Sequence, residues 1–163
     1  MLIRAVTLDD RQAWIDLAHE SDVLIITLIP DITAFYEGFD EYMLRKIGKH
    51  EAFIAVNRLS SHCLGIIAYS KNHNRISFLG VTGKADFWLV GSKLMQVALD
   101  QLDNMQEISV NVLKSNAEIL KHERELYELF GFSATGDAAI EAGIPAFVMK
   151  RPAIPSVSNE VRP

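Results

Sequence analysis

A short stretch in the middle of the chain has the residue pattern of an anion-binding turn. The sequence VTGKADFWLVGSKLM, residues 81–95, begins like the end of a strand and continues like the start of a helix that contains Gly91. A helix N-terminus binds phosphate groups through free backbone N–H groups and the positive end of its dipole. No proline interrupts the stretch, so all of these N–H groups are present. This turn is therefore the first candidate binding site.

The side chain of Asp86 decides whether that site is open. A carboxylate repels a nearby phosphate by roughly 3 kcal/mol per charge pair at ~5 Å and an effective dielectric of ~20, before screening by salt. Lys84 and Lys93 are close enough in sequence to offset part of this repulsion. In the alternative orientation, Asp86 caps the helix and occupies the N–H groups that a phosphate needs.

Three bulky residues follow Asp86 and also allow two interpretations. Phe87, Trp88 and Leu89 either flank a bound ligand or are core and interface residues of a loop without one. In the second case Phe87 and Trp88 are candidates for the contact of a homodimer.

The elements that would position this turn alternate between strands and helices. Apolar residues in period two predict strands, and those spaced three and four apart predict helices. Strands are predicted at 2–6, 52–56, 64–69, 75–81, 108–112, 132–134 and 146–150; helices are predicted after 7–10 and at 31–49, 89–102 and 116–130.

This order predicts a mixed α/β fold, with an antiparallel meander at 52–81 and a strand–helix–strand unit at 75–113. Such a unit requires a parallel strand pair with a right-handed crossover. Ligands of such sheets lie at the carboxyl ends of the strands, next to the helix N-terminus. We expect one domain over residues 1–151 and a poorly ordered tail at 152–163.

The composition excludes several classes of function. The 163 residues suffice for one domain with a core, and 49% of them are hydrophobic. A net charge of −5 without a Lys/Arg cluster gives no basic surface for nucleic acid. No apolar run approaches the ~20 residues that span a bilayer, and MLIRAV is too short for a signal peptide. We therefore expect a soluble, cytoplasmic protein that binds neither nucleic acid nor membrane.

Metal and disulfide chemistry are not expected. Cys63 is the only cysteine, and the apolar run CLGIIA that it opens predicts a buried structural thiol. The five histidines show no metal-ligand spacing.

The chain resembles the GNAT family, the Gcn5-related N-acetyltransferases, over nearly all of residues 1–151. The most specific match is LYELFGF at 126–132, which is similar to the family's last helix and the strand after it. The resemblance implies a GNAT-like fold and acetyl-CoA as co-substrate. Weaker matches are IRA with Asp9 and Asp10, LGII at 64–67, FLGV at 78–81, and Asn116.

The resemblance also implies a set of cofactor-binding residues. The end of the fourth strand, with Leu79 and Val81, would lie against acetyl-CoA. The family's phosphate loop, Arg/Gln-x-x-Gly-x-Gly/Ala, aligns without gaps on Asp86, Leu89 and Gly91, so only Gly91 matches. The implied cofactor-binding residues are Leu79, Val81, Asp86, Phe87, Trp88, Leu89, Val90, Gly91, Ser92 and Asn116.

For the chemistry, the resemblance implies that Tyr127 is the general acid for the departing thiolate. Its alternative role is that of an ordinary tyrosine on an apolar helix face. Asn116 and Tyr127 are eleven residues apart, where family members commonly have about seven. Four extra residues lengthen a helix by ~6 Å, so Tyr127, counted back from Gly131, carries over better than Asn116. We expect the inserted residues 121–125, KHERE, to form a solvated turn.

The general base is absent from the predicted fourth strand, which offers Ser77 but no carboxylate. Glu37, Asp40 and Glu41 could hold or deprotonate an amine, although a solvent-facing acidic stripe is the alternative.

The function predicted is transfer of an acetyl group from acetyl-CoA directly to an amine of a small molecule or peptide. The alternative is a non-catalytic binding or regulatory module of the same fold that has lost or weakened acetyl-CoA binding. Tightly paired strands at 79–81 and 110–112 would instead favour an unrelated α/β protein.

Overall fold

The computed structural model describes residues 1–25, 32–114, 118–141 and 143–155. Its strands are β1 (Leu2–Ala5), β2 (Ala52–Val56), β3 (Cys63–Ser70), β4 (Arg75–Val81), β5 (Ile108–Leu113), β6 (Ser133–Glu141) and β7 (Ile144–Arg151). Its helices are α1 (Arg11–Ile25), α2 (Ile32–Gly48), α3 (Phe87–Leu99) and α4 (Glu118–Leu129), with a 3-10 turn at Leu8–Asp10.

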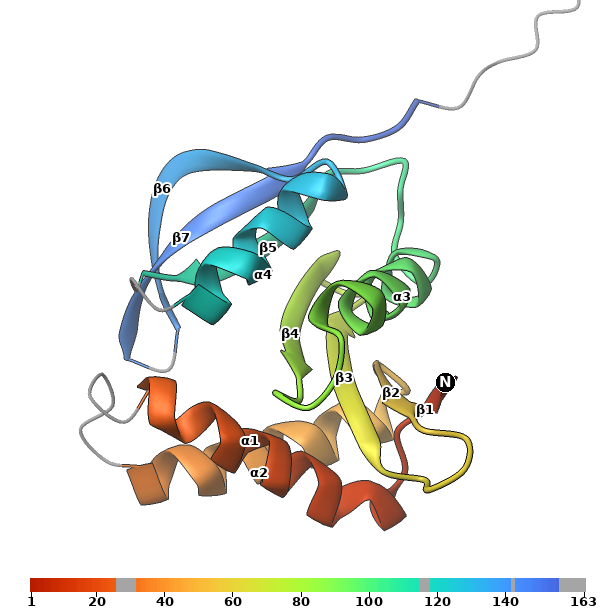
Figure 1. The fold of residues 1–163 in the computed structure, drawn as a ribbon. Helices are drawn as coiled ribbons and strands as arrows, with labels where there is room; N and C mark the ends of the chain where they lie inside the picture. Colours follow the sequence, from red (N-terminus) through yellow and green to blue (C-terminus); the bar gives the residue numbers. More distant parts are fainter. Residues whose placement is uncertain (26–31, 115–117, 142, 156–163) are drawn as a thin grey trace, which may run out of the picture.

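Within the described residues, seven strands form one sheet in the order β1-β2-β3-β4-β5-β7-β6 (Figure 1). Among these described strands β4 and β5 form the one parallel pair, whereas the other neighbouring strands are antiparallel. The predicted mixed α/β fold with one parallel pair is therefore confirmed.

Two helix layers cover the two faces of the sheet. Trp14 of α1 and Met43 of α2 are fully buried in one core with the β2 and β3 side chains. Leu94 of α3 and Leu126 of α4 are equally buried in the other core, which includes β5. The apolar stripes read from the sequence therefore face the sheet, as their helical spacing predicted.

The sequence misplaced the boundaries of several elements, including those of β6 and α3. The segment from Gly136 was predicted to be a connection, but β6 continues to Glu141 because its last residues pair with the start of β7. Helix α3 begins at Phe87, two residues earlier than the apolar period indicated, because Asp86 caps it.

The tail is described only in part. The segment 152–155 has no helix or strand, and the N–H of Ile154 donates to the Asn104 carbonyl oxygen at 2.8 Å. Residues 156–163 lie outside the described residues, as does Asp31, the first residue of the helix predicted at 31–49. In the part of the chain that the structure describes, no helix is long and apolar enough to cross a membrane.

A buried ion pair joins α2 to the start of β2. The Lys46 ammonium lies 3.0 Å from Glu51 Oε2 and also donates to the Tyr69 carbonyl oxygen. Glu51 Oε1 accepts the Lys71 N–H at 2.9 Å. Burial opposes ionisation of Glu51, but the hydrogen bonds from Lys71 and Lys46 outweigh it and lower its pKa. The pair therefore ties the α2 end to β2 and to the turn after β3.

We predict that Glu51→Gln lowers the free energy of unfolding by about 3 kcal/mol or more, because it leaves a buried ammonium without a counter-charge. Urea unfolding at pH 7 measures the loss. The matched control is Glu107→Gln, since Glu107 pairs with Lys150 at the surface, where a pair contributes about 1 kcal/mol or less. Equal losses in the two variants would contradict the structural role of the Lys46–Glu51 pair.

Candidate functional site

The parallel strands β4 and β5 are joined at one end only. Their pairing covers Arg75↔Ser109 and Ile76↔Val110 and ends there. Beyond these residues the two strands run apart (Figure 1). The segments 79–81 and 110–112 are thus not paired with each other. Tight pairing of these segments would have favoured an unrelated α/β protein, and the structure does not have it.

A bulge in β4 explains the separation. Ala68↔Phe78 and Tyr69↔Ile76 are consecutive pairs with β3, so Ser77 is an extra residue in β4. A bulge bends its strand and increases the local twist. Ser77 directly follows the last residue paired with β5, and its Oγ accepts the Tyr42 hydroxyl at 2.6 Å. The bend therefore begins where the β4–β5 pairing ends.

The backbone of β4 past the bulge offers unpaired polar groups toward β5. The Thr82 N–H donates to the Leu64 carbonyl oxygen on β3, at 3.0 Å. Hydrogen-bonding direction alternates along an antiparallel strand, so the N–H and C=O groups of Leu79 and Val81 point to the β5 side. These two residues are the ones that the sequence placed in the cofactor site.

At the N-terminus of α3, the Asp86 side chain caps the helix. Its Oδ1 accepts the Leu89 N–H at 2.9 Å, with Asp86 in an extended conformation. Of the two orientations considered for Asp86, the structure has the one that occupies a helix N–H. The N–H groups of Phe87 and Trp88 precede the first intrahelical bond, from the Val90 N–H to the Asp86 carbonyl oxygen.

A second carboxylate holds the turn that precedes α3. Glu20 Oε2, on α1, accepts the Gly83 N–H at 3.1 Å. Two acidic side chains, Glu20 and Asp86, thus satisfy N–H groups of the turn where a bound anion would compete for them. Both carboxylates are exposed to solvent, so they can turn away.

The three bulky residues after Asp86 have different surroundings. The rings of Phe87 and Trp88 lie 5.5 Å apart, and both contact the His122 ring on α4, at 6.1 and 5.6 Å. Leu89 is exposed, with 54% of its surface accessible. Phe87 and Trp88 thus join the N-terminal ends of α3 and α4, and a homodimer contact through them stays a prediction.

Gly91, the one match to the phosphate loop, has a packing role. A Cβ at this position would lie 2.7 Å from Leu126 Cδ2, and Leu126 is fully buried on α4. The neighbouring Val90 is buried in the core, while Ser92 is half-buried. Close approach of the two helices is therefore sufficient to require glycine at residue 91.

The prediction of a solvated turn at residues 121–125 is correct only in part: Lys121 and Arg124 are exposed, whereas Glu123 is buried deeply enough to raise its pKa. These residues lie inside α4, where Lys121–Glu125 and Arg124–Glu128 form pairs of 3.9 and 3.8 Å one turn apart. Such i, i+4 pairs support a helix through these residues. Asn116 lies outside the described residues, so its predicted contact with the cofactor stays a prediction.

The extended helix brings Glu123 against Tyr127. The Tyr127 hydroxyl donates to Glu123 Oε1 at 2.7 Å, and the tyrosine ring, 1% exposed, packs on Phe132. Burial raises the pKa of Glu123 to about 7, although the hydrogen bond from Tyr127 opposes this. Burial and the neighbouring Glu123 charge raise the pKa of Tyr127 well above its usual value. The i, i+4 spacing of the two residues on one helix was the sequence signal for this pair.

The acidic residues of α2 are engaged elsewhere or exposed. Asp40 accepts the Arg11 guanidinium at 2.7 Å and the Trp14 indole N–H at 2.9 Å, which ties α2 to α1. Glu37 and Glu41 are solvent-exposed. These contacts and this exposure favour a solvent-facing acidic stripe, with a structural role for Asp40, over a general base. Cys63 is half-buried, and burial raises its pKa to about 11, so its thiol is unreactive at neutral pH.

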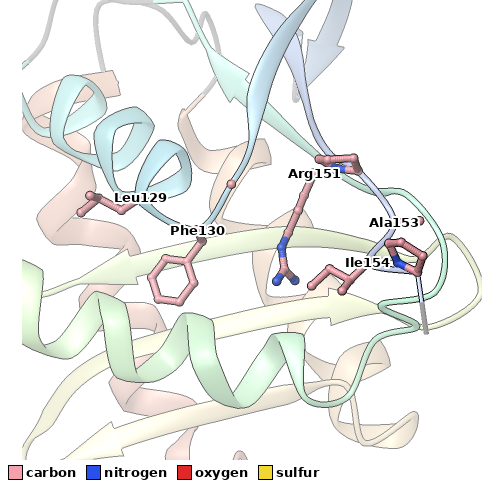
Figure 2. Close-up of a pocket in the computed structure, with 8 residues that line it drawn as sticks. Leu129, Phe130, Arg151, Ala153 and Ile154 are labelled. Carbon is pink, nitrogen blue, oxygen red and sulfur yellow. The ribbon is translucent and has the colours of Figure 1, made fainter. Parts of the chain in front are cut away.

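A hollow of about 550 Å³ lies at the other end of α4 (Figure 2). Leu129–Gly131 and Arg151–Pro155 line it, and Arg151 Nη1 donates to Asn104 Oδ1 at 2.6 Å. Arg151 pairs with Ile108, the first residue of β5, whereas β4 and β5 separate beyond Val110. The hollow therefore lies at the end of β5 where the β4–β5 pairing begins, and not where the two strands separate.

Comparison with known proteins identifies the family of the chain. The family model described as an acetyltransferase (GNAT) domain matches residues 18–152. The chain belongs to the GNAT acetyltransferase family. The resemblance read from the sequence and the enzyme class that it implied are confirmed at this level. No curated protein matches the chain significantly in sequence.

Solved structures share the fold of this GNAT protein at low sequence identity. The PaiA N-acetyltransferase of Thermoplasma acidophilum, solved with coenzyme A, has a TM-score of 0.70 at 17% identity, over 93% of this chain and 98% of that one. The ribosomal-protein-S18-alanine N-acetyltransferase of Escherichia coli has a TM-score of 0.68 at 14% identity, over 97% of each chain. An aminoglycoside 6'-acetyltransferase type Ii has a TM-score of 0.65 at 16% identity, over 100% of each chain. At these identities the likeness shows the fold alone.

We predict that Gly91→Ala lowers the free energy of unfolding by about 1–2 kcal/mol, because overpacking against Leu126 outweighs the better helix propensity of alanine. In a double-mutant cycle with Leu126→Ala, the two losses should be less than additive. Chemical denaturation measures both, with Gly83→Ala as a control, since a Cβ at Gly83 meets nothing within 4 Å. Full additivity would contradict the contact.

Glu123 should make stability depend on pH. Its pKa is raised from 4.5 to about 7, so the folded state keeps a proton that the unfolded chain loses between these values. The contribution of Glu123 to stability is therefore greatest below about pH 4.5 and declines as pH rises to 7. We predict that Glu123→Gln gains about 1–3 kcal/mol relative to wild type between pH 5 and pH 8 in urea titrations. Exposed Glu128→Gln should gain nothing, and a constant difference for Glu123→Gln would contradict the raised pKa.

Proposed function

We propose that this GNAT protein transfers the acetyl group of acetyl-CoA to an amine without an acyl-enzyme intermediate. The observation that carries the proposal is the separation of β4 and β5 beyond Ile76 and Val110. A sheet whose central parallel strands separate offers backbone hydrogen-bonding groups that an extended ligand can satisfy. The Leu79 and Val81 backbone groups fit the amide-bearing arm of acetyl-CoA in both chemistry and direction.

The residues fit the reacting end of acetyl-CoA as well. Tyr127 belongs to the buried cluster that contains Leu79, Val110 and Val112, the side chains of the diverging strands. A neutral, buried hydroxyl can donate a proton to a departing thiolate, which is the role proposed for Tyr127. Since the described β4 carries no carboxylate, the amine is proposed to react in its neutral form and to release its proton to water.

The phosphate end fits less well. Asp86 and Glu20 already occupy N–H groups of the turn, and Asp86 adds a negative charge near the pyrophosphate position. We propose that acetyl-CoA displaces the Asp86 cap, which is worth about 1 kcal/mol, and binds weakly for this reason. The same observation favours a second candidate function, a non-catalytic module of the GNAT fold without acetyl-CoA binding.

The acceptor is proposed to be a small-molecule or peptide amine. Two structural relatives are named for such acceptors, an alanine of a ribosomal protein and an aminoglycoside. An assay of coenzyme A release with an alanine-terminated peptide and with an aminoglycoside tests both classes.

Asp86→Asn separates the charge of Asp86 from its capping role, because asparagine is an equally good N-cap. We predict that it tightens acetyl-CoA binding about 5–30-fold, the equivalent of 1–2 kcal/mol of relieved repulsion. Isothermal titration calorimetry measures the affinity, and the gain should shrink as NaCl is raised, since salt screens the repulsion.

The matched control is Asp100→Asn, at the opposite end of α3, which should leave the affinity unchanged. Millimolar acetyl-CoA should also raise the melting temperature of the wild type. No shift in the wild type, in Asp86→Asn or in Asp86→Arg/Leu89→Gly would contradict the enzyme and favour the non-catalytic module.

A further inference from the structure

Among the residues that the structure describes, Glu123 is the hydrogen-bond partner of the Tyr127 hydroxyl. The hydroxyl donates to Glu123 Oε1 at 2.7 Å from the next turn of α4, while the ring is fixed against Phe132 and is 1% exposed. A fully buried ring has little rotational freedom, so the hydroxyl proton has one preferred direction, toward Glu123. Any donation by Tyr127 to a ligand therefore requires Glu123 to release this proton.

The charge state of Glu123 depends on few neighbours. On α4, Lys121 pairs with Glu125, Arg124 pairs with Glu128, and His122 contacts the aromatic rings of α3. On α3 the titratable side chain is the exposed Lys93, and β5 carries none. Burial and Tyr127 are accordingly what set the pKa of Glu123 at about 7.

Two protonation states of this pair have opposite consequences for proton donation. An ionised Glu123 accepts the Tyr127 proton in a charge-assisted hydrogen bond, which is stronger than a neutral one. A protonated Glu123 can itself donate to the Tyr127 oxygen, which leaves the tyrosine proton free for another acceptor.

We propose that Glu123 is a positioning residue that controls the Tyr127 proton: its carboxylate holds the proton, and its carboxylic acid releases it toward the departing sulfur. The inference rests on the proposed acetyl transfer and adds a residue to it.

The proton steps balance. The amine nitrogen forms a bond to the acetyl carbon as the carbon–sulfur bond breaks, and sulfur leaves with the electron pair. Sulfur takes the Tyr127 proton, and the Tyr127 oxygen takes the Glu123 proton. The new amide releases the amine proton to water, and water reprotonates Glu123, so that each turnover consumes one amine and one thioester.

The test is the ratio of coenzyme A release by Glu123→Gln to that by wild type, measured from pH 5.5 to 8.5 at saturating acetyl-CoA. The glutamine amide donates to Tyr127 at every pH, as only the protonated acid does. Ionisation of the amine acceptor affects both proteins equally and cancels in the ratio. We expect the ratio to rise about tenfold between pH 6 and pH 8, because one pH unit above a pKa only about a tenth of the acid stays protonated.

Glu128→Gln, an exposed change on the same helix, should give a flat ratio, as would a purely structural role of Glu123. NMR of the ¹³C-labelled glutamate carboxyls provides a second measurement without turnover, and Glu123 should titrate near pH 7. A flat ratio for Glu123→Gln, or titration near pH 4.5, overturns the inference and leaves the proposed function intact. No coenzyme A release by wild type at any pH overturns the proposed function itself.

Discussion

The bulge at Ser77 is the constraint on which the candidate site depends. The pairing of β5 with β7 is continuous from Ile108 to Leu113, so β5 keeps its course, while β4 follows β3 and bends at the extra residue. Two parallel strands that are held by different neighbours can separate without losing the rest of the sheet. The hydrogen bond from Tyr42 to Ser77 fixes the bulge to α2. The unpaired backbone of Leu79 and Val81 follows from this geometry.

At the N-terminus of α3, side-chain carboxylates and a bound anion would compete for the same hydrogen-bond donors. Asp86 and Glu20 satisfy turn N–H groups that an anion would use, and Phe87, Trp88 and His122 connect α3 to α4 beside them. An N-cap carboxylate stabilises a helix by about 1 kcal/mol through a hydrogen bond to the helix N-terminus. A pyrophosphate can accept hydrogen bonds from several N–H groups at once. The balance between the two decides between a weakly binding enzyme and a non-catalytic module.

Local patterns predicted most of the fold and only part of the site. Period two in residues 108–112 and the apolar stripe of α3 determined strand and helix, because burial on one side imposes these spacings. The bulge at Ser77 could not be predicted, since an extra residue in a strand leaves no mark on a short apolar run. Within residues 121–125, Glu123 was wrongly expected in solvent because charge suggests exposure, whereas its carboxylate accepts the hydroxyl of the buried Tyr127. For Asp86 the sequence offered two orientations, and only the structure distinguishes them.

Amide hydrogen exchange at β4 tests the central claim, that the unpaired edge of this strand binds acetyl-CoA, most directly. Without ligand, the amides of Leu79 and Val81 should exchange faster than that of Gly80, which the alternation directs toward β3. With saturating acetyl-CoA, the Leu79 and Val81 amides should become protected while Gly80 stays unchanged. Protection of both amides before acetyl-CoA is added, or no change after its addition, would contradict the account.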